Sequence, residues 1–292
     1  MKQFQNFKAW KEILDFPLKG RQAKPRDKGL SMIIDKGMGI TETRELLELA
    51  ADYIDFIKLG FGTSAFYSPK LLREKTELVR SCGVDIFPGG TFLEVAVLQG
   101  KLERFLGIAG ELGFNCIEVS DGTIDMPVQD RARAIKLACR AGFKVLSEVG
   151  KKDPRDSKSS SIIKDQIARD LDCGAFKVIV EGRESGQGVV IYDAQGEIKE
   201  KAITDLVEAV EDVNVLLWEA PLKKQQQELI MRFGPNVNLG NIQPGEVLAL
   251  EALRVGLRGD TLRMCIELPS SLAKKERGVL YPGQEIATVE GI

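Results

Sequence analysis

Short apolar runs alternate with longer amphipathic segments along most of this chain. The runs span four to six residues, as buried strands do, and the segments between them repeat apolar residues at helical spacing. We predict eight strands, at residues 31–34, 54–59, 84–87, 116–119, 144–149, 176–180, 215–218 and 237–241. We predict helices at residues 41–51, 69–82, 92–112 (as one helix or two), 128–141, 161–171, 202–211, 222–233 and 246–255.

The predicted helix ends carry residues that commonly start and stop helices. Ser68 and Pro69 stand where an N-cap and a first helical residue belong, and Gly83 follows that helix. Thr41 is a suitable N-cap for the first helix of the repeat. Outside the repeat we predict a helix over residues 1–20, a small hairpin over 189–198 and an irregular tail over 262–292.

Eight strand–helix units follow one another without an internal linker. Alternating strands and helices predict a parallel sheet, and eight units predict its closure into a (β/α)8 TIM barrel. An open doubly wound sheet is the alternative, but no Gly-x-Gly-x-x-Gly opens the first helix, which disfavours a dinucleotide-binding fold. We therefore expect residues 1–292 to form one α/β domain with an N-terminal helix and a C-terminal extension.

Composition narrows the class of protein. The formal net charge is −2 and no Lys/Arg-rich run stands out, so we expect no nucleic-acid or anionic-membrane partner. No apolar stretch reaches the roughly 20 residues of a membrane span, and we find no signal-peptide pattern at the N-terminus. The five cysteines are scattered and form no CxxC, as in a reducing compartment. We expect a cytoplasmic protein that forms an oligomer of identical chains.

Histidine is absent from the sequence. This excludes Ser-His-Asp and Cys-His catalysis and every metal site that contains histidine. Proton transfer must then use Lys, Glu, Asp, Tyr or Cys. A divalent metal would be held by oxygen atoms, which points to magnesium or manganese.

Charged and polar residues stand at the C-terminal ends of nearly all the predicted strands. In chain order these are Asp35 with Lys36, Lys58, the turn Gly89-Gly90, Glu118 with Asp121, Glu148 with Lys151, Glu181 with Arg183, Glu219, and Asn241. A barrel brings them to one face, where TIM-barrel active sites lie. Carboxylates on neighbouring strands cannot all stay ionised close together without cations, so we predict a magnesium ion with lysines and arginines around it. Salt bridges that close the barrel rim are the alternative.

Eight short motifs lie at or near these strand ends, and a ninth follows the last predicted helix. They are SMIIDKG (31–37), IKLG (57–60), FPGGT (87–91), IEVSDG (117–122), EVGKK (148–152), EGRESG (181–186), WEAP (218–221), LGNI (239–242) and LRGDT (257–261). In this order, over about residues 24–261, they resemble the phosphosulfolactate synthase family. The resemblance implies a (β/α)8 barrel and a magnesium-dependent Michael-type addition of sulfite to phosphoenolpyruvate, giving (2R)-phospho-3-sulfolactate.

The family reaction serves coenzyme M synthesis in methanogens and sulfolactate production in some bacteria. The family also contains plant heat-stress-associated members, so a non-enzymatic, stress-related barrel is one alternative. A magnesium-dependent lyase or aldolase that acts on another enolate is a second alternative, because it would use the same groups.

The implied reaction needs a general acid that protonates carbon C2, and without histidine a lysine is the best candidate. We predict that Lys151 delivers this proton, with Lys58 as its main competitor and the neighbouring Lys152 as a weaker one. Glu219 is predicted to belong to the same catalytic face.

The other predicted roles concern the metal and the anionic substrates. The predicted magnesium site, formed directly or through water, consists of Asp121, Glu148 and Glu181. Phosphate and sulfite need cationic or N–H donors. The residues predicted to bind them are Lys36, Arg183, Gly89, Gly90 and Asn241.

Overall fold

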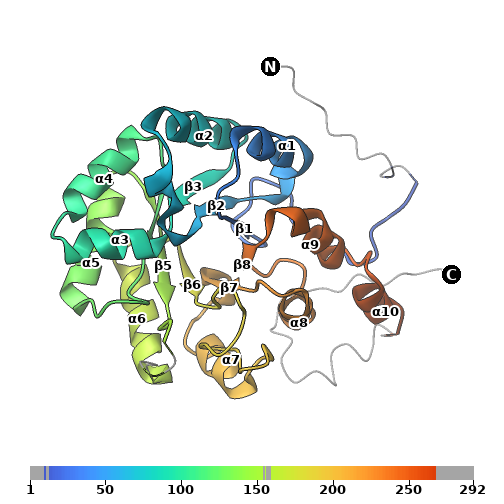
Figure 1. Ribbon diagram of the computed structural model, residues 1–292. Coiled ribbons are helices and arrows are strands. Elements are labelled where there is room, and N and C mark those ends of the chain that lie inside the picture. Colours follow the sequence, from blue (N-terminus) through green and yellow to red (C-terminus); the bar gives the residue numbers. More distant parts are fainter. Residues whose placement is uncertain (1–9, 11–12, 154, 156–158, 268–292) are drawn as a thin grey trace.

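The computed structural model describes residues 10, 13–153, 155 and 159–267. In this part of the chain eight parallel strands form one sheet, ordered β3-β2-β1-β8-β7-β6-β5-β4, with helices around it (Figure 1). The strands are β1 (Ser31–Asp35), β2 (Phe56–Leu59), β3 (Asp85–Pro88), β4 (Cys116–Val119), β5 (Lys144–Val149), β6 (Lys177–Val180), β7 (Leu216–Glu219) and β8 (Leu239–Ile242). Because β1 pairs with both β2 and β8, the predicted (β/α)8 barrel is confirmed and the open doubly wound sheet is excluded.

The helices pack around the sheet through apolar faces. They are α1 (Ile40–Ala50), α2 (Pro69–Ser81), α3 (Gly90–Leu98), α4 (Leu102–Glu111), α5 (Val128–Arg140), α6 (Ser160–Asp172), α7 (Glu200–Val207), α8 (Lys223–Phe233), α9 (Val247–Arg254) and α10 (Gly259–Glu267). In α2, for example, Leu72 and Val79 are buried at helical spacing. The predicted start of this helix is confirmed, because the Ser68 side chain accepts a hydrogen bond from the Leu71 N–H and Pro69 is the first helical residue.

Some local predictions differ from the structure. The N-cap of α1 is Gly39 rather than Thr41. The predicted hairpin is reduced to one antiparallel bridge, between Tyr192 and Ile198. Residues 13–20 are not helical, and the rest of the predicted helix over 1–20 falls mostly outside the described residues. The predicted irregular tail begins inside a helix, α10, and residues 268–292 lie outside the described part, so the extent of the single domain stays a prediction.

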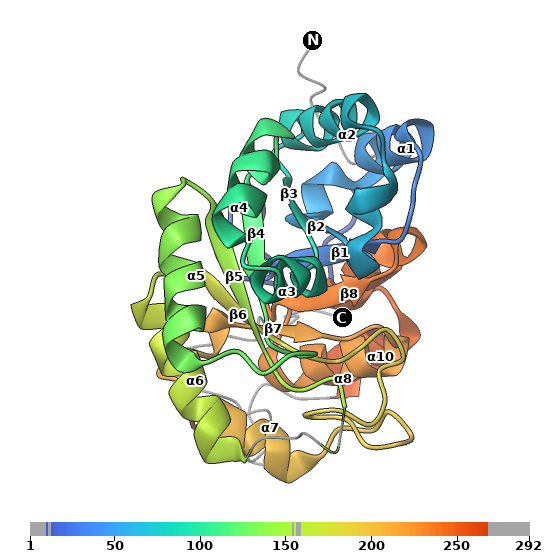
Figure 2. The ribbon, with the colours of Figure 1, turned by 60° about the vertical axis from the view of Figure 1, so that its left-hand side comes forward.

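The contact between β3 and β4 differs from the other strand contacts of the barrel, because it has no backbone ladder in the described chain. The two strands are the edges of the sheet. They lie side by side (Figure 2), and the Asn115 side chain links their N-terminal ends. Its Oδ1 accepts from the Ile86 N–H at 3.0 Å, and its Nδ2 donates to Asp85 Oδ1 at 2.6 Å. Side-chain hydrogen bonds therefore replace part of the missing ladder.

The interior of the barrel changes from apolar to charged along the strands. A separate apolar cluster fills the interior toward the N-terminal ends of the strands. It is formed by Leu30, Met32, Phe56, Phe87, Cys116, Leu146, Ile179 and Leu217. Side chains two positions apart on a strand point the same way. Lys58, Glu148 and Glu219 follow Phe56, Leu146 and Leu217 at this spacing, so the same strand faces deliver charge at the C-terminal ends. We call this end of the barrel the mouth.

No helix among the described residues is both long and apolar enough to cross a membrane.

Candidate active site

Lys58 lies among acidic side chains at the mouth of the barrel. Its Nζ atom lies 2.9 Å from Glu118 Oε2, 3.2 Å from Glu148 Oε2 and 3.2 Å from Glu219 Oε1. Glu181, which follows β6, is a fourth buried acid beside them. Each of these five side chains is more than nine-tenths buried. We call Lys58, Glu118, Glu148, Glu181 and Glu219 the mouth cluster.

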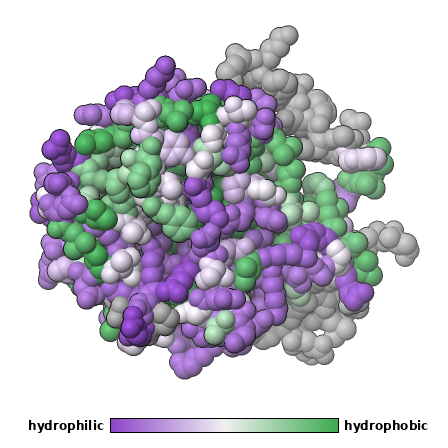
Figure 3. All heavy atoms as spheres, in the orientation of Figure 1, coloured by the Kyte–Doolittle hydropathy of each residue, from purple (hydrophilic) through white to green (hydrophobic). Residues whose placement is uncertain are grey.

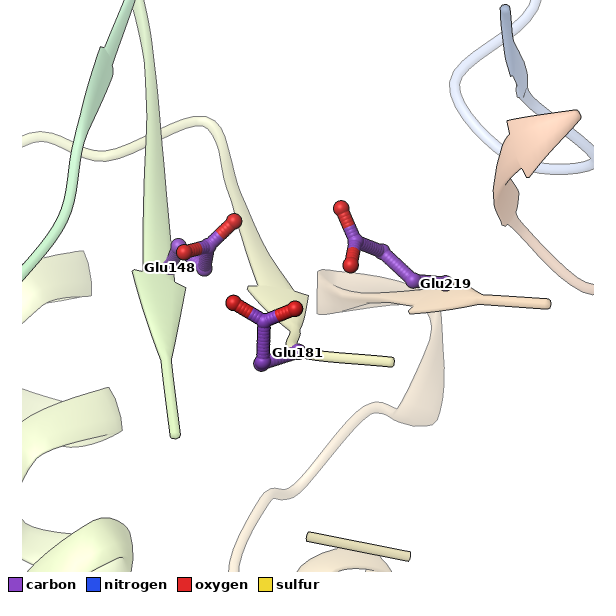
Figure 4. Close-up of side chains that lie close together, drawn as sticks. All are labelled: Glu148, Glu181 and Glu219. Carbon is purple, nitrogen blue, oxygen red and sulfur yellow. The ribbon is translucent and has the colours of Figure 1, made fainter. Parts of the chain in front are cut away.

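Three acids of the mouth cluster form a pocket of oxygen atoms. Glu148, Glu181 and Glu219 point toward one another from three successive strands (Figure 4), and one oxygen from each lies within 4.8 Å of the others. Glu148 Oε1 and Glu181 Oε2 are buried and have no hydrogen-bond partner in the described chain. A buried polar atom without a partner is costly, so these oxygens are the ones that a cation would satisfy.

Backbone N–H groups of two glycines orient the other acids. The Gly90 N–H donates to Glu118 Oε1 at 2.9 Å, and the Gly182 N–H donates to Glu219 Oε2 at 2.9 Å. A Cβ atom on Gly90 would lie 2.4 Å from Glu118 Oε1, and one on Gly182 would lie 2.5 Å from the Glu219 carbonyl oxygen. Glycine is therefore needed at both positions for the backbone to approach the carboxylates.

Burial and neighbouring charges push the protonation states of the cluster apart. Burial is the main cause that raises the pKa of Glu118 to about 8, and it also raises the pKa of Glu181 well above its ordinary value. Burial acts in the same direction on Glu148, but Lys58 and then Lys152 outweigh it and lower the pKa of Glu148 to about 2. Burial opposes the charge of Lys58, yet the surrounding carboxylates raise its pKa well above the ordinary value, so it stays an ammonium ion.

The charges near the mouth balance in one of two ways: Glu118 and Glu181 hold protons, as their raised pKa values favour, or a further cation is bound. Two ammonium groups, those of Lys58 and Lys152, face the four carboxyl groups of the cluster. With all six ionised, four negative and two positive charges leave two negative charges, the amount that one divalent cation neutralises. Carboxylate oxygens are the ligands that Mg²⁺ prefers. The residues at the mouth therefore fit the magnesium ion that the sequence predicts.

The two adjacent lysines after β5 point to different places. Lys152 Nζ lies 4.0 Å from Glu148 Oε1 and 3.9 Å from Glu181 Oε2, and its side chain is half-buried beside the cluster. Lys151 is buried away from it, where Nζ donates to the carbonyl oxygens of Asp121 and Ile124 and to a carboxylate oxygen of Asp125. Lys152, not Lys151, thus lies beside the acids, although Lys151 is the predicted proton donor.

Asp121 lies outside the oxygen pocket, although it is predicted as a metal ligand. Its Oδ1 accepts from Arg131 at 3.0 Å and from Gln166 at 3.1 Å. Arg131 is buried and also donates to Asp170 and to the carbonyl oxygen of Glu148, which ties α5 and α6 to the end of β5. Of the predicted ligand set the structure brings Glu148 and Glu181 together, and Glu219 takes the third place.

The network around Arg131 is missed by sequence reasoning. Arg131 and Asp170 lie on the faces of predicted helices, where charged residues are usually solvated. The one available signal is that each falls on the apolar side of its helix, next to Ala134 and Ile167.

The residues predicted to bind substrate anions line different parts of the mouth. Gly89 and Gly90 begin α3, where Gly90 contacts Glu118. Arg183 follows the cluster acid of β6, and its carbonyl oxygen accepts from Asn241 Nδ2 at 3.3 Å. Asn241 Oδ1 is buried with no partner in the described chain, so it has an acceptor left for a ligand. Lys36 is exposed and pairs with Glu184.

Asp35 belongs to the predicted functional face, and the structure gives it a local partner set. Its Oδ1 accepts from the N–H groups of Gly37 and Met38, and its Oδ2 pairs with Lys75 of α2 at 2.5 Å. Asp35 and Lys75 are both fully buried. The salt-bridge alternative therefore describes the acid at the end of β1 well. Glu148 on β5 and Glu181 after β6 each have a carboxylate oxygen with no hydrogen-bond partner in the described chain.

A hollow of about 690 Å³ lies at the opposite end of the barrel, near the N-terminal end of β3. It is lined in part by Arg73, Arg80 and Asp85. Arg73 and Arg80 already donate to the carbonyl oxygens of Glu111 and Gly113. Asp85 also has a partner, Lys144, whereas four buried carboxyl groups converge at the mouth, and we place the candidate active site there.

Fold and site together define a class: a TIM barrel that gathers buried carboxyl groups and lysines at its mouth. Residues 19–260 match the family model described as (2R)-phospho-3-sulfolactate synthase (ComA), and the chain belongs to this family.

Named relatives agree with the family match. The phosphosulfolactate synthase of Methanothermobacter thermautotrophicus is 45% identical over 250 residues, which is 85% of this chain and 96% of that protein. The phosphosulfolactate synthase of Methanocaldococcus jannaschii is 44% identical over 237 residues, covering 80% and 94% of the two chains. Among solved structures, 3-keto-L-gulonate-6-phosphate decarboxylase from Vibrio cholerae superposes with a TM-score of 0.52 at 12% identity, over 81% of this chain and 98% of that one, which shows the shared fold alone.

Proposed function

We propose that this protein is a magnesium-dependent phosphosulfolactate synthase, which adds sulfite to phosphoenolpyruvate to give (2R)-phospho-3-sulfolactate. The observation that carries the proposal is the mouth cluster, where four buried carboxyl groups lie beside two lysines in a chain of this family. An addition to an anionic enol phosphate needs ligands for a metal ion and cationic hydrogen-bond donors. The cluster supplies both, from carboxylates and lysines, in a chain that has no histidine.

Both substrates are anions, and uncompensated carboxylates would repel them. A magnesium ion held by Glu148, Glu181 and Glu219 would offset this charge and stabilise the negative charge that develops on the substrate carboxylate. Lys58 stays charged and holds Glu148 and Glu219 in place, together with Glu118 on the other side. We assign Lys58 to the electrostatic support of the acids rather than to proton delivery, because three carboxylate oxygens at 2.9–3.2 Å enclose its ammonium group.

The addition itself forms a bond between the sulfur lone pair of sulfite and C3 of phosphoenolpyruvate. The electrons of the carbon–carbon double bond move toward C2 and the carboxylate, and C2 then takes a proton. We propose Lys152 as the donor, because its ammonium group lies beside Glu148 and Glu181 and its side chain, 32% exposed, is more accessible than that of Lys58. Lys151 is held by three acceptors in the β4–α5 loop and acts by fixing that loop.

The test of the proposed function is consumption of phosphoenolpyruvate by the purified protein. We expect turnover only when sulfite and Mg²⁺ are both present, with (2R)-phospho-3-sulfolactate as the product. Equal consumption with and without sulfite would favour a lyase acting on another enolate. No consumption under any condition would favour a stress-related binding protein. Turnover that survives removal of divalent metal by a chelator would contradict the magnesium part of the proposal.

A further inference from the structure

The turn after β6 contacts two of the three acids in the oxygen pocket. The Gly182 N–H donates to Glu219 Oε2 at 2.9 Å, and the next N–H, that of Arg183, donates to Glu181 Oε1 at 2.6 Å. Glu181 Oε2 is left without a hydrogen-bond partner in the described chain, 3.9 Å from Lys152 Nζ, while Glu219 Oε1 faces Lys58. The direction of these two peptide groups therefore decides which carboxylate oxygens face the pocket.

Arg183 holds an unfavourable backbone conformation in this turn. Its φ is +59°, in the left-handed region where a side chain crowds the following carbonyl oxygen. Gly182 cannot exchange roles with it, because a Cβ at Gly182 would meet the backbone of Glu219. Backbone strain of this kind persists only where surrounding contacts hold it.

The contact that holds Arg183 comes from β8. Asn241 Nδ2 donates to the Arg183 carbonyl oxygen at 3.3 Å and so spans the end of β7, where Glu219 lies. Asn241 is buried and has a φ of +56°, and asparagine tolerates the left-handed region better than most residues. Two residues with left-handed backbone, Arg183 in the turn after β6 and Asn241 on β8, are thus joined across Glu219.

We propose that Asn241 is a positioning residue, which holds the Gly182–Arg183 turn so that the carboxylates of Glu181 and Glu219 are oriented for a divalent cation. The inference rests on the proposed magnesium site and adds to it the residue that sets its ligand geometry. In the described chain the Asn241 side chain hydrogen-bonds to the Arg183 carbonyl oxygen and to none of the pocket oxygens, so it acts through the Arg183 peptide group.

Loss of the amide is expected to let Arg183 relax toward the right-handed region, which would withdraw its N–H from Glu181. Outer partners that orient metal ligands are commonly worth about 10–100-fold in metal affinity, and we expect a loss of this size in Asn241→Gly. Glycine keeps the left-handed backbone at position 241 and removes only the amide. In the double variant Asn241→Gly/Arg183→Gly, glycine at position 183 adopts the left-handed conformation without strain, so part of the cation affinity should return.

The matched control is Asn238→Ala, at the other end of the same strand. Asn238 is buried and binds the Leu30 N–H and the carbonyl oxygens of Asn214 and Leu216, far from the pocket along β8. Its loss should lower thermal stability and leave cation affinity unchanged. A merely structural role for Asn241 would give the same pattern.

The measurement is the dissociation constant for Mn²⁺, by calorimetry and by the electron paramagnetic resonance signal of free Mn²⁺, on the full chain. Asn241→Asp serves as a second variant, since it keeps the size and loses the donor. Its added negative charge alone would strengthen binding, so weaker binding must come from the lost hydrogen bond.

Weaker Mn²⁺ binding in Asn241→Gly and Asn241→Asp, but not in Asn238→Ala, supports the proposal. Unchanged or tighter binding in both Asn241 variants overturns it while the metal site stands. If the wild-type protein binds no Mn²⁺, the metal part of the proposed function fails and this inference fails with it. If Asn241→Gly does not fold, Asn241→Asp decides.

Discussion

The acid at the end of β1 and the acids at the ends of β5 and β6 are equally buried and differ in their surroundings. Asp35 has one ammonium group and two backbone N–H groups, so its charge is answered locally. Glu148 and Glu181 each keep a buried oxygen without a hydrogen-bond partner in the described chain, with Lys152 Nζ no nearer than 3.9 Å. A buried acid at a barrel mouth is thus no sign of function in itself, and the excess of charge over local partners is what marks the site.

The largest expected effect separates the two lysines that follow β5. Lys152→Ala should lower turnover by about 10²–10⁴-fold, the usual worth of a positioned acid, while phosphoenolpyruvate still binds. Steady-state rates and ligand binding on the same sample measure this. Lys151→Ala is the control, because it should loosen the β4–α5 loop and change turnover far less. Near-normal turnover in Lys152→Ala with loss in Lys151→Ala would return the proton transfer to Lys151.

On the β1 side the expected effect is on stability. Lys75→Met leaves Asp35 buried without its counter-charge, and removing one partner of a buried pair typically costs about 3–5 kcal/mol of unfolding free energy. Urea unfolding measures the change, and turnover per folded molecule should be unaffected. Lys36→Ala breaks an exposed pair with Glu184 and should cost about 1 kcal/mol or less. Lost turnover in stable Lys75→Met protein would mean that Asp35 belongs to the active site.

Substitutions of the acids in the oxygen pocket should change turnover and cation affinity more than stability, the reverse of the effect expected for the Asp35–Lys75 pair. Glu148→Gln removes a predicted ligand and should lower turnover and divalent-cation affinity together by about 100-fold or more. Its unfolding free energy in metal-free buffer should change less than that of Lys75→Met, because Glu118 and Glu219 still pair with Lys58. Asp35→Asn, the equivalent change at β1, should leave cation affinity intact. Lost cation affinity in Asp35→Asn with unchanged affinity in Glu148→Gln would contradict this assignment.

The smallest expected effect is a pH dependence of stability in metal-free protein. Glu118 has a folded-state pKa of about 8, above its unfolded value, so the folded state holds the proton more tightly. This stabilisation is fully present below the unfolded pKa and is lost as pH rises through about 8, with a slope of at most about 1.4 kcal/mol per pH unit. Denaturant unfolding between pH 5 and about 9 measures it. Glu118→Gln should flatten the slope, and an unchanged slope would place the titration elsewhere.

Much of the fold was predictable because each strand carries its own signal. Strands β4 and β5 have the predicted boundaries, 116–119 and 144–149, because apolar runs end there in charged residues and glycine. The tail was harder to predict, because α10 begins at a glycine and continues beyond the eighth repeat unit. This helix packs against α8 and α9, and its contacts with α8 join residues far apart in the sequence.

The site was predictable as a ring of strand-end charges, and its internal pairing was not. Glu148 and Glu219 each stand two residues after an inward-facing leucine on the same strand, so their side chains also point into the barrel. Neighbouring residues after the strand end, such as Lys151 and Lys152, have no such rule, because the loop decides their directions. Asp121 could not be separated from the pocket acids, since its partner Arg131 lies on a helix and has no marking in the local sequence.

The barrel is expected to open locally between β3 and β4, the two strands that no backbone ladder joins in the described chain. Backbone ladders hold β1 and β8 on both sides, whereas each of these two strands has a ladder on one side and the Asn115 side chain at one end of the other. Amide protons along the open edges can therefore exchange with solvent through local opening, while those of β1 and β8 must wait for the whole barrel to unfold. Gly90 and Glu118 flank this contact at the mouth, so the same slow opening reaches the active site from its side.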